Sequence, residues 1–174
     1  PRAPYIIREN PNGTYKGTRP NKGTDGLATA DQPHNYWGGL FSTTTGSDAT
    51  SRYVFTNSPV WPIITASEIQ FVKAEALLRK NDKPAALAAY LNGINLNFDQ
   101  LLADYQTNVP VGLRISPASR AAYLANPIHV PAAVNLTLSH IMLQKYIAMY
   151  VWGITETWVD MRRFHYTDLD PVTG

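Results

Sequence analysis

Residues 136–166, LTLSHIMLQKYIAMYVWGITETWVDMRRFHY, carry the longest helical pattern in the sequence. Apolar residues recur there at spacings of three and four, the period of one helix face; they are Leu143, Ile147, Tyr150, Ile154, Trp158 and Met161. Asn135 is suited to cap the start. Arg162 and Arg163 place positive charge at the end, where the helix dipole is negative. We therefore predict one buried helix of roughly 45 Å, with Trp158 in the core.

Residues 63–105 predict two further helices joined by a tight turn. Thr65 stands where a helix cap belongs, and Glu68 follows three residues later, as in a capping box. Pro84 opens the second helix in its first turn, where a missing N–H has no consequence. Around residues 93–97, the sequence Gly-Ile-Asn-Leu-Asn predicts that the second helix frays or breaks.

The spacing of small and aromatic residues in this hairpin is typical of a tetratricopeptide repeat; the residues concerned are Ala74, Asn81, Ala86 and Tyr90. A single repeat cannot bury both of its faces, so either the long C-terminal helix or further repeats must cover it. We predict a mainly α fold: a helical part over residues 63–174, in which this hairpin packs on the long helix, and a loop-rich lobe over residues 1–62 of the same domain, rich in Gly and Pro.

Composition excludes several classes of protein. The chain has 174 residues, enough for one domain with its own core. It has no cysteine, which rules out disulfides and thiol nucleophiles. Its net charge of +2 is too small to indicate a nucleic-acid partner. Five basic residues and one acid lie within residues 1–24, and we interpret this basic arm as a solvated loop rather than a phosphate-binding segment. The chain begins at Pro1, and we expect a targeting or anchoring segment upstream.

Two separated motifs are similar to those of a known family. The run QKYIA at residues 144–148, followed by E-x-W-x-D-x-R-R at residues 156–163, resembles the C-terminal signature of SusD/RagB-type proteins. The run EIQFVKAEA at residues 68–76 resembles the other hallmark of that family. The similarity covers about residues 60–168, and the family is much longer, so the resemblance identifies this chain as a C-terminal part.

This resemblance implies a fold and a function. Members are surface nutrient-binding lipoproteins of Gram-negative bacteria, with tetratricopeptide-like hairpins packed against an irregular lobe. The implied ligand is an oligosaccharide, less often a peptide. The implied partners are a SusC-like TonB-dependent outer-membrane transporter and the missing N-terminal part of the same protein. The implied location is the cell surface, where an upstream lipid anchors the protein to the outer membrane.

Aromatic residues of the loop-rich lobe are our candidates for ligand binding. A flat ring offers an apolar face to a sugar while polar neighbours bond its hydroxyl groups. The segment DQPHNYWGG at residues 31–39 is the richest in such groups. The candidates are His34, Asn35, Tyr36 and Trp37, with Tyr15 and Tyr53. An equally weighted alternative is that Trp37 anchors the loops onto the helices.

The charged residues of the C-terminal motif are interpreted as structural. Glu156 and Asp160 lie one helical turn apart and share a face with Arg163, which favours ion pairing over a catalytic carboxylate pair. Trp158 and Arg162 complete this structural set. The four histidines lack the spacing of metal ligands, and no nucleophile motif is present. We predict no enzymatic activity, metal or cofactor. The alternative to glycan capture is a tetratricopeptide-like adaptor that binds a protein or peptide and has no affinity for sugars.

Overall fold

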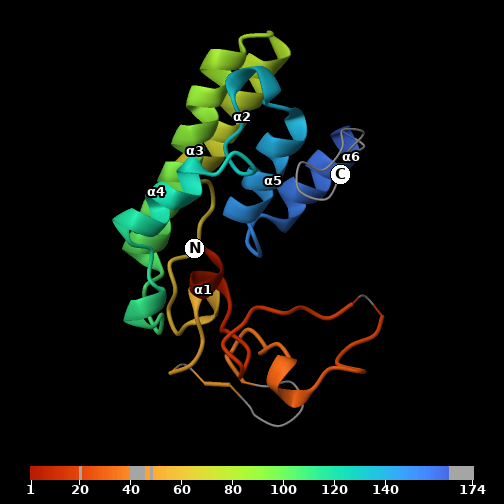
Figure 1. Ribbon diagram of the computed structural model, residues 1–174, viewed down its shortest axis with the longest axis vertical. Helices are drawn as coiled ribbons and strands as arrows, with labels where there is room; N and C mark the ends of the chain where they lie inside the picture. Colours follow the sequence, from red (N-terminus) through yellow and green to blue (C-terminus); the bar gives the residue numbers. More distant parts are fainter. Residues whose placement is uncertain (20, 40–45, 48, 165–174) are drawn as a thin grey trace. The chain divides into compact units, whose positions relative to one another are not determined.

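The computed structural model describes residues 1–19, 21–39, 46–47 and 49–164. Within these ranges the chain is mainly helical, and the only extended pairing is a single bridge at His34. The predicted mainly α class is therefore confirmed. The helices, shown in Figure 1, are α1 (Ala3–Ile6), α2 (Ala66–Arg79), α3 (Lys83–Asp104), α4 (Pro117–Ala125), α5 (Leu138–Ala148) and α6 (Ile154–Phe164). Short 3-10 turns lie at η1 (Thr29–Asp31), η2 (Tyr53–Phe55), η3 (Val111–Leu113) and η4 (Ala133–Asn135).

The chain divides into two compact units. The first comprises residues 1–61 and 100–116, and the second begins at residue 62, leaves out residues 100–116 and resumes at residue 117. The last turns of α3 therefore belong to the first unit, together with the N-terminal loops.

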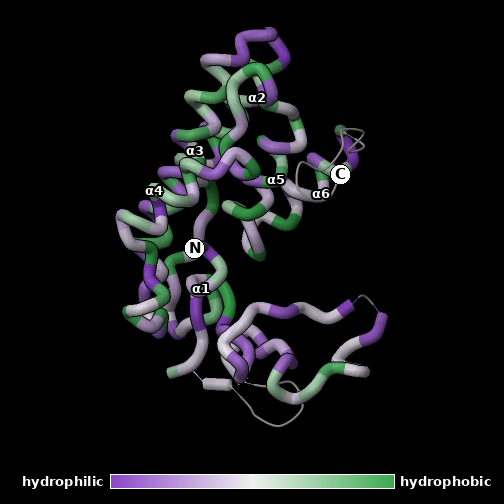
Figure 2. The backbone as a smooth tube through the Cα atoms, viewed as in Figure 1, coloured by the Kyte–Doolittle hydropathy of each residue, from purple (hydrophilic) through white to green (hydrophobic). Residues whose placement is uncertain are grey.

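The predicted hairpin of the second unit is present as α2 and α3. The side chain of Thr65 caps α2 by accepting a 3.1 Å bond from the Glu68 N–H. Ala74, Ala86 and Tyr90 are buried, as the repeat-like spacing predicts. Asn81 takes a left-handed conformation, with φ of 61°, at the turn. Figure 1 shows the two helices side by side, and Figure 2 shows the turn that joins them as hydrophilic.

The predicted break near residues 93–97 is wrong, because α3 is continuous from Lys83 to Asp104. Gly93 lies inside the helix where α2 approaches most closely. A Cβ placed on it would lie 2.8 Å from the ring of Phe71. Its carbonyl also accepts a 2.8 Å bond from the Ser67 hydroxyl. Tertiary packing of this kind outweighs the low helix propensity of Gly and Asn.

The predicted single helix over residues 136–166 is also wrong. The structure has two helices there, α5 and α6, separated by residues 149–153. Val151 has a φ of 76°, a left-handed conformation that interrupts helical bonding. The start differs too: Thr137, not Asn135, is the cap, and it forms a capping box with His140. His165 and Tyr166, the predicted end, lie outside the described residues.

The C-terminal segment nevertheless covers the hairpin as predicted. Helix α5 packs against α2, and it buries Ile141, Met142 and Ala148. Helix α6 differs, because Ile154, Trp158 and Met161 are 67%, 56% and 46% exposed. The prediction of Trp158 as a core residue is therefore wrong. The turn at residues 149–153 shifts the helical phase, so side chains that share one face of a straight helix no longer point to the same side.

Candidate functional site

Arg52 organises the loops of the first unit from the inside. Its guanidinium is 4% exposed and pairs with the carboxylate of Glu9 at 2.9 Å. It also donates to the carbonyls of Pro4 at 3.0 Å, Ile7 at 3.1 Å and Asn108 at 3.1 Å. A planar guanidinium suits several acceptors at once. These bonds fix the segment that enters η2 against α1 and against residues 105–115.

A tight turn at residues 35–39 presents the candidate aromatic residues. The Asn35 N–H donates to the Gly39 carbonyl at 2.7 Å, and the Gly39 N–H donates back to the Asn35 side chain at 3.0 Å. Gly38 has a φ of 81°, and a Cβ there would lie 2.4 Å from the Thr50 carbonyl oxygen, so only glycine fits. The Thr50 hydroxyl in turn donates to the Trp37 carbonyl at 2.8 Å. The Asn35 side chain therefore shapes the turn.

Tyr36, Trp37 and Phe55 form one cluster, which we call the aromatic platform. The ring of Tyr36 stacks on Phe55 with centroids 4.4 Å apart and planes at 15°. Trp37 lies 5.7 Å from Phe55 at 60°. Tyr36 and Trp37 are 39% and 53% exposed, whereas Phe55 is half-buried beneath them. The structure thus brings two predicted residues together on a support that the sequence analysis missed.

Tyr53 is buried, whereas a ligand-binding residue must be exposed. Its side chain is 3% exposed and packs against Tyr105, with ring centroids 4.5 Å apart. Its φ of 59° is left-handed, and within η2 Tyr53 is buried whereas Phe55 is half-buried and stacks against Tyr36. Phe55, two residues after Tyr53, is the aromatic residue of η2 that joins the platform.

His34 and Tyr15 lie close to the charges around Arg52. Burial, followed by the positive charge of Arg8, lowers the pKa of His34, so the imidazole is neutral at pH 7. Its Nδ1 is buried and has no hydrogen-bond partner among the described residues. Burial and the Glu9 carboxylate raise the pKa of Tyr15, which is 40% exposed. Both side chains are therefore uncharged polar groups.

The charged residues of the C-terminal motif form a network within the second unit. Lys145 pairs with Asp160 at 2.7 Å, and both are buried. Arg163 bonds Asp160 at 2.9 Å and Glu75 at 3.0 Å, and Glu75 pairs with Arg79 at 2.9 Å. These contacts tie α6 to α5 and α2. The carboxylates of Asp160 and Glu75 are thus committed to ion pairs.

The predicted membership of this network needs correction. Asp160 and Arg163 are paired, as their spacing predicts. Glu156 is exposed on α6, and the second carboxylate that Arg163 contacts is that of Glu75. Arg162 and Trp158 are exposed as well. The prediction rested on helix spacing alone, which cannot show that Lys145 and Glu75 approach from other helices.

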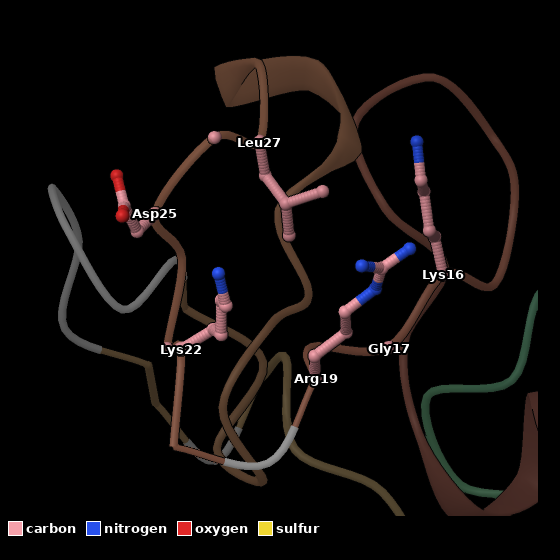
Figure 3. A pocket seen from close by; sticks show the side chains of 8 residues that line it. Lys16, Gly17, Arg19, Lys22, Asp25 and Leu27 are labelled. Atoms are coloured by element: carbon pink, nitrogen blue, oxygen red, sulfur yellow. The ribbon is translucent and has the colours of Figure 1, made fainter.

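A hollow of about 400 Å³ lies in the first unit. None of the residues that line it belongs to the aromatic platform. Figure 3 shows the charged groups of Arg19, Lys22 and Asp25 around the side chain of Leu27. Lys16 also lines it and pairs with Asp31 at 2.9 Å. The remaining lining residues are Gly17, Gly23 and Gly26. The charge pattern of this basic segment predicts a solvated loop.

Among the described residues, no group of three or more His, Asp or Glu side chains is placed to hold a metal ion. No helix in the described part of the chain has the length and hydropathy that crossing a membrane requires.

Comparison with protein families matches the whole chain, residues 1–174, to a SusD-like family described as "Starch-binding associating with outer membrane". No curated protein and no solved structure matches the chain. The match extends beyond the motifs at residues 68–76 and 144–163 and includes the loops that carry the aromatic platform. It confirms the resemblance that those motifs indicated.

Proposed function

The chain belongs to the SusD-like family of starch-binding proteins that associate with the outer membrane, and on this premise we propose that it captures an oligosaccharide at the bacterial cell surface. The proposal is for binding without chemistry and without a cofactor. It extends to delivery of the glycan to a SusC-like TonB-dependent transporter.

The aromatic platform is the observation that carries this proposal. Tyr36 and Trp37 expose flat rings at a hydrogen-bonded turn, and Phe55 contacts both rings. Ring faces of this kind cover the apolar C–H face of a sugar, and neighbouring polar groups then select its hydroxyl groups. Asn35 is half-buried at the turn that carries the two rings, and we propose its Nδ2 group for this role, since Nδ1 of His34 is buried. A preformed surface of this kind binds without a large loss of conformational entropy.

Calorimetric titration against a panel of starch-derived and other neutral oligosaccharides tests this function. Trp37→Ala is expected to weaken binding about tenfold or more, because a stacked aromatic ring contributes most of the contact area. The matched control is Trp61→Ala, which removes a tryptophan of the same unit that is equally exposed, at 57%. Equal loss in both variants, or binding unaffected by Trp37→Ala, contradicts the platform as the site.

The location and the partners are further parts of the proposal. Anchoring by a lipid on an upstream segment predicts that the full protein fractionates with the outer membrane and is cleaved by protease added to intact cells. Association with a SusC-like transporter predicts co-purification of the two from solubilised membranes. Recovery of the full protein in the soluble fraction contradicts the anchoring.

A second candidate function is supported by apolar exposure on the helices. Ile69 and Val72 of α2 are 49% and 47% exposed, in the helical part where a tetratricopeptide-like adaptor binds peptides. An adaptor predicts indifference to every oligosaccharide and peptide binding that Ile69→Ser abolishes. Binding of a glycan that depends on Trp37 excludes this function as the principal one.

A further inference from the structure

Backbone hydrogen bonds shape the hollow, which is lined by described residues within 16–19 and 22–27. The N–H groups of Lys22, Asp25 and Leu27 bond the carbonyls three residues before them, each at 3.1 Å. Gly23 and Gly26 have φ values of 55° and 74°, which the left-handed bends require. The loop thereby curls around a space of about 400 Å³, which lies within the range of small-ligand sites.

The lining of this hollow carries an excess of positive charge. Three cations, Lys16, Arg19 and Lys22, face one anion, Asp25. Lys16 is neutralised by Asp31 at 2.9 Å. Within the described part of the chain, Arg19 and Lys22 have no ion-pair partner. Two cations thus point toward a space that can hold a ligand (Figure 3).

We propose that this hollow binds an acidic sugar, a uronate unit, of the captured glycan, with the carboxylate held by Arg19 and Lys22. This inference rests on the proposed function and names the class of substrate. A guanidinium accommodates a carboxylate by two parallel hydrogen bonds, and the ammonium of Lys22 adds a second charge. The side chain of Leu27 supplies an apolar surface for the sugar ring.

The shape of the hollow favours a sugar over an anionic lipid surface. A membrane surface is bound by a row of cations with exposed apolar side chains that insert beside the headgroups. Here the cations surround a concave space, and the apolar side chain in the lining, Leu27, is half-buried. A single glycan unit fits this arrangement of charge around one apolar contact.

Calorimetric titration with three uronic-acid trimers, of galacturonate, mannuronate and glucuronate, each paired with its methyl ester, tests the inference. At least one acid is expected to bind about tenfold more tightly than its ester, and increasing NaCl from 50 to 500 mM is expected to remove most of that difference. The variant with Arg19→Gln and Lys22→Gln is expected to bind the acid no better than the ester. Asp25→Asn is expected to tighten acid binding about twofold to fivefold.

The control variant carries Lys80→Gln and Arg162→Gln, which removes two exposed cations of the second unit and gives the same change in net charge. It is expected to retain the preference for the acid. Three results overturn the inference: equal binding of acid and ester in all three pairs, an unaltered acid affinity in the variant of Arg19 and Lys22, or an equal loss in the control. Specific binding to phosphatidylglycerol vesicles through Arg19 and Lys22, without preference for an acid trimer, also overturns it and assigns the site to a headgroup.

Failure of this inference and failure of the proposed function give different results. If the acidic subsite is absent, neutral oligosaccharides still bind and Trp37→Ala still lowers their affinity. The acid trimers then bind no more tightly than their methyl esters. Without the proposed function, neither neutral oligosaccharides nor methyl esters bind to the wild-type protein or to the Trp37→Ala variant.

Discussion

The Nζ atom of Lys145 lies 2.7 Å from Oδ2 of Asp160, and the two side chains are 7% and 8% exposed. Fifteen positions separate them in the sequence, which corresponds to roughly 22 Å along a continuous helix. The ion pair therefore exists only because the chain turns between α5 and α6. It fixes α6 on α5 after a segment that contains a left-handed Val151.

Breaking this pair from one side is expected to be costly. Asp160→Leu leaves the buried ammonium of Lys145 without its partner, and we expect a loss of about 3–5 kcal/mol in the free energy of unfolding. Adding Lys145→Met to that variant removes the unpaired charge and is expected to restore much of the loss. Urea unfolding at pH 7 measures both. A double variant no more stable than the single one contradicts the buried-pair interpretation.

Substitution of Arg163 tests the exposed part of the ion-pair network around Asp160. The side chain of Arg163 is 51% exposed, although it bonds both Asp160 and Glu75. Solvent screens such a contact, so Arg163→Met is expected to cost only about 1 kcal/mol or less. Glycan affinity of the folded variant is expected to be unchanged, and weaker binding at full stability contradicts a purely structural role.

Replacing Gly93 with alanine is not expected to increase the stability of the fold, although helix propensity alone favours alanine at this position. Alanine is a better helix former by about 1 kcal/mol, but its Cβ would lie 2.8 Å from the Phe71 ring. Overpacking costs about 1–3 kcal/mol, so Gly93→Ala is expected to be neutral or destabilising in thermal unfolding. The exposed neighbour Asn92 is the control. Asn92→Ala is expected to raise the free energy of unfolding by about 0.5 kcal/mol. A clear gain from Gly93→Ala contradicts the close approach of α2 and α3.

Glu9 predicts a pH dependence of stability. Burial acts to raise its pKa, but a backbone hydrogen bond and the contact with Arg52 outweigh it, so the folded pKa is lowered from 4.5. The stabilisation is then fully present above about pH 4.5 and is lost as the pH falls through the folded pKa. The difference in unfolding free energy between wild type and Glu9→Gln is expected to narrow below that pH. Urea unfolding between pH 3 and pH 7 measures it, and a difference that widens in acid contradicts the assignment.

Phe55 is expected to matter for binding without touching the ligand. Phe55→Leu keeps an apolar side chain under Tyr36 but removes the flat surface on which its ring stacks. Loss of an aromatic pair of about 0.5–1.5 kcal/mol corresponds to roughly twofold to tenfold weaker glycan binding. Tyr146→Ala, which removes a partly exposed ring on α5, is the control. Unaltered affinity in Phe55→Leu contradicts the supporting role.

Local signals in the sequence were sufficient for much of the helical part. The cap at Thr65, the small residues at Ala74 and Ala86, and the turn at Asn81 act between neighbours in the chain or in one hairpin, and the structure confirms each of them. The family motifs at residues 68–76 and 144–163 likewise identified the family that the whole chain matches.

The sequence by itself thus determined the helical class and the hairpin, because short-range periodicity and capping encode them, and its two motifs resembled those of the family that the whole chain matches. Only the tertiary structure decided that α3 runs through Gly93, that α5 and α6 are separate, and that Lys145 pairs with Asp160. It also decided that Tyr53 is buried and that Phe55 supports the platform. Each of these depends on atoms from distant segments, whose packing outweighs local propensities of about 1 kcal/mol or less per residue.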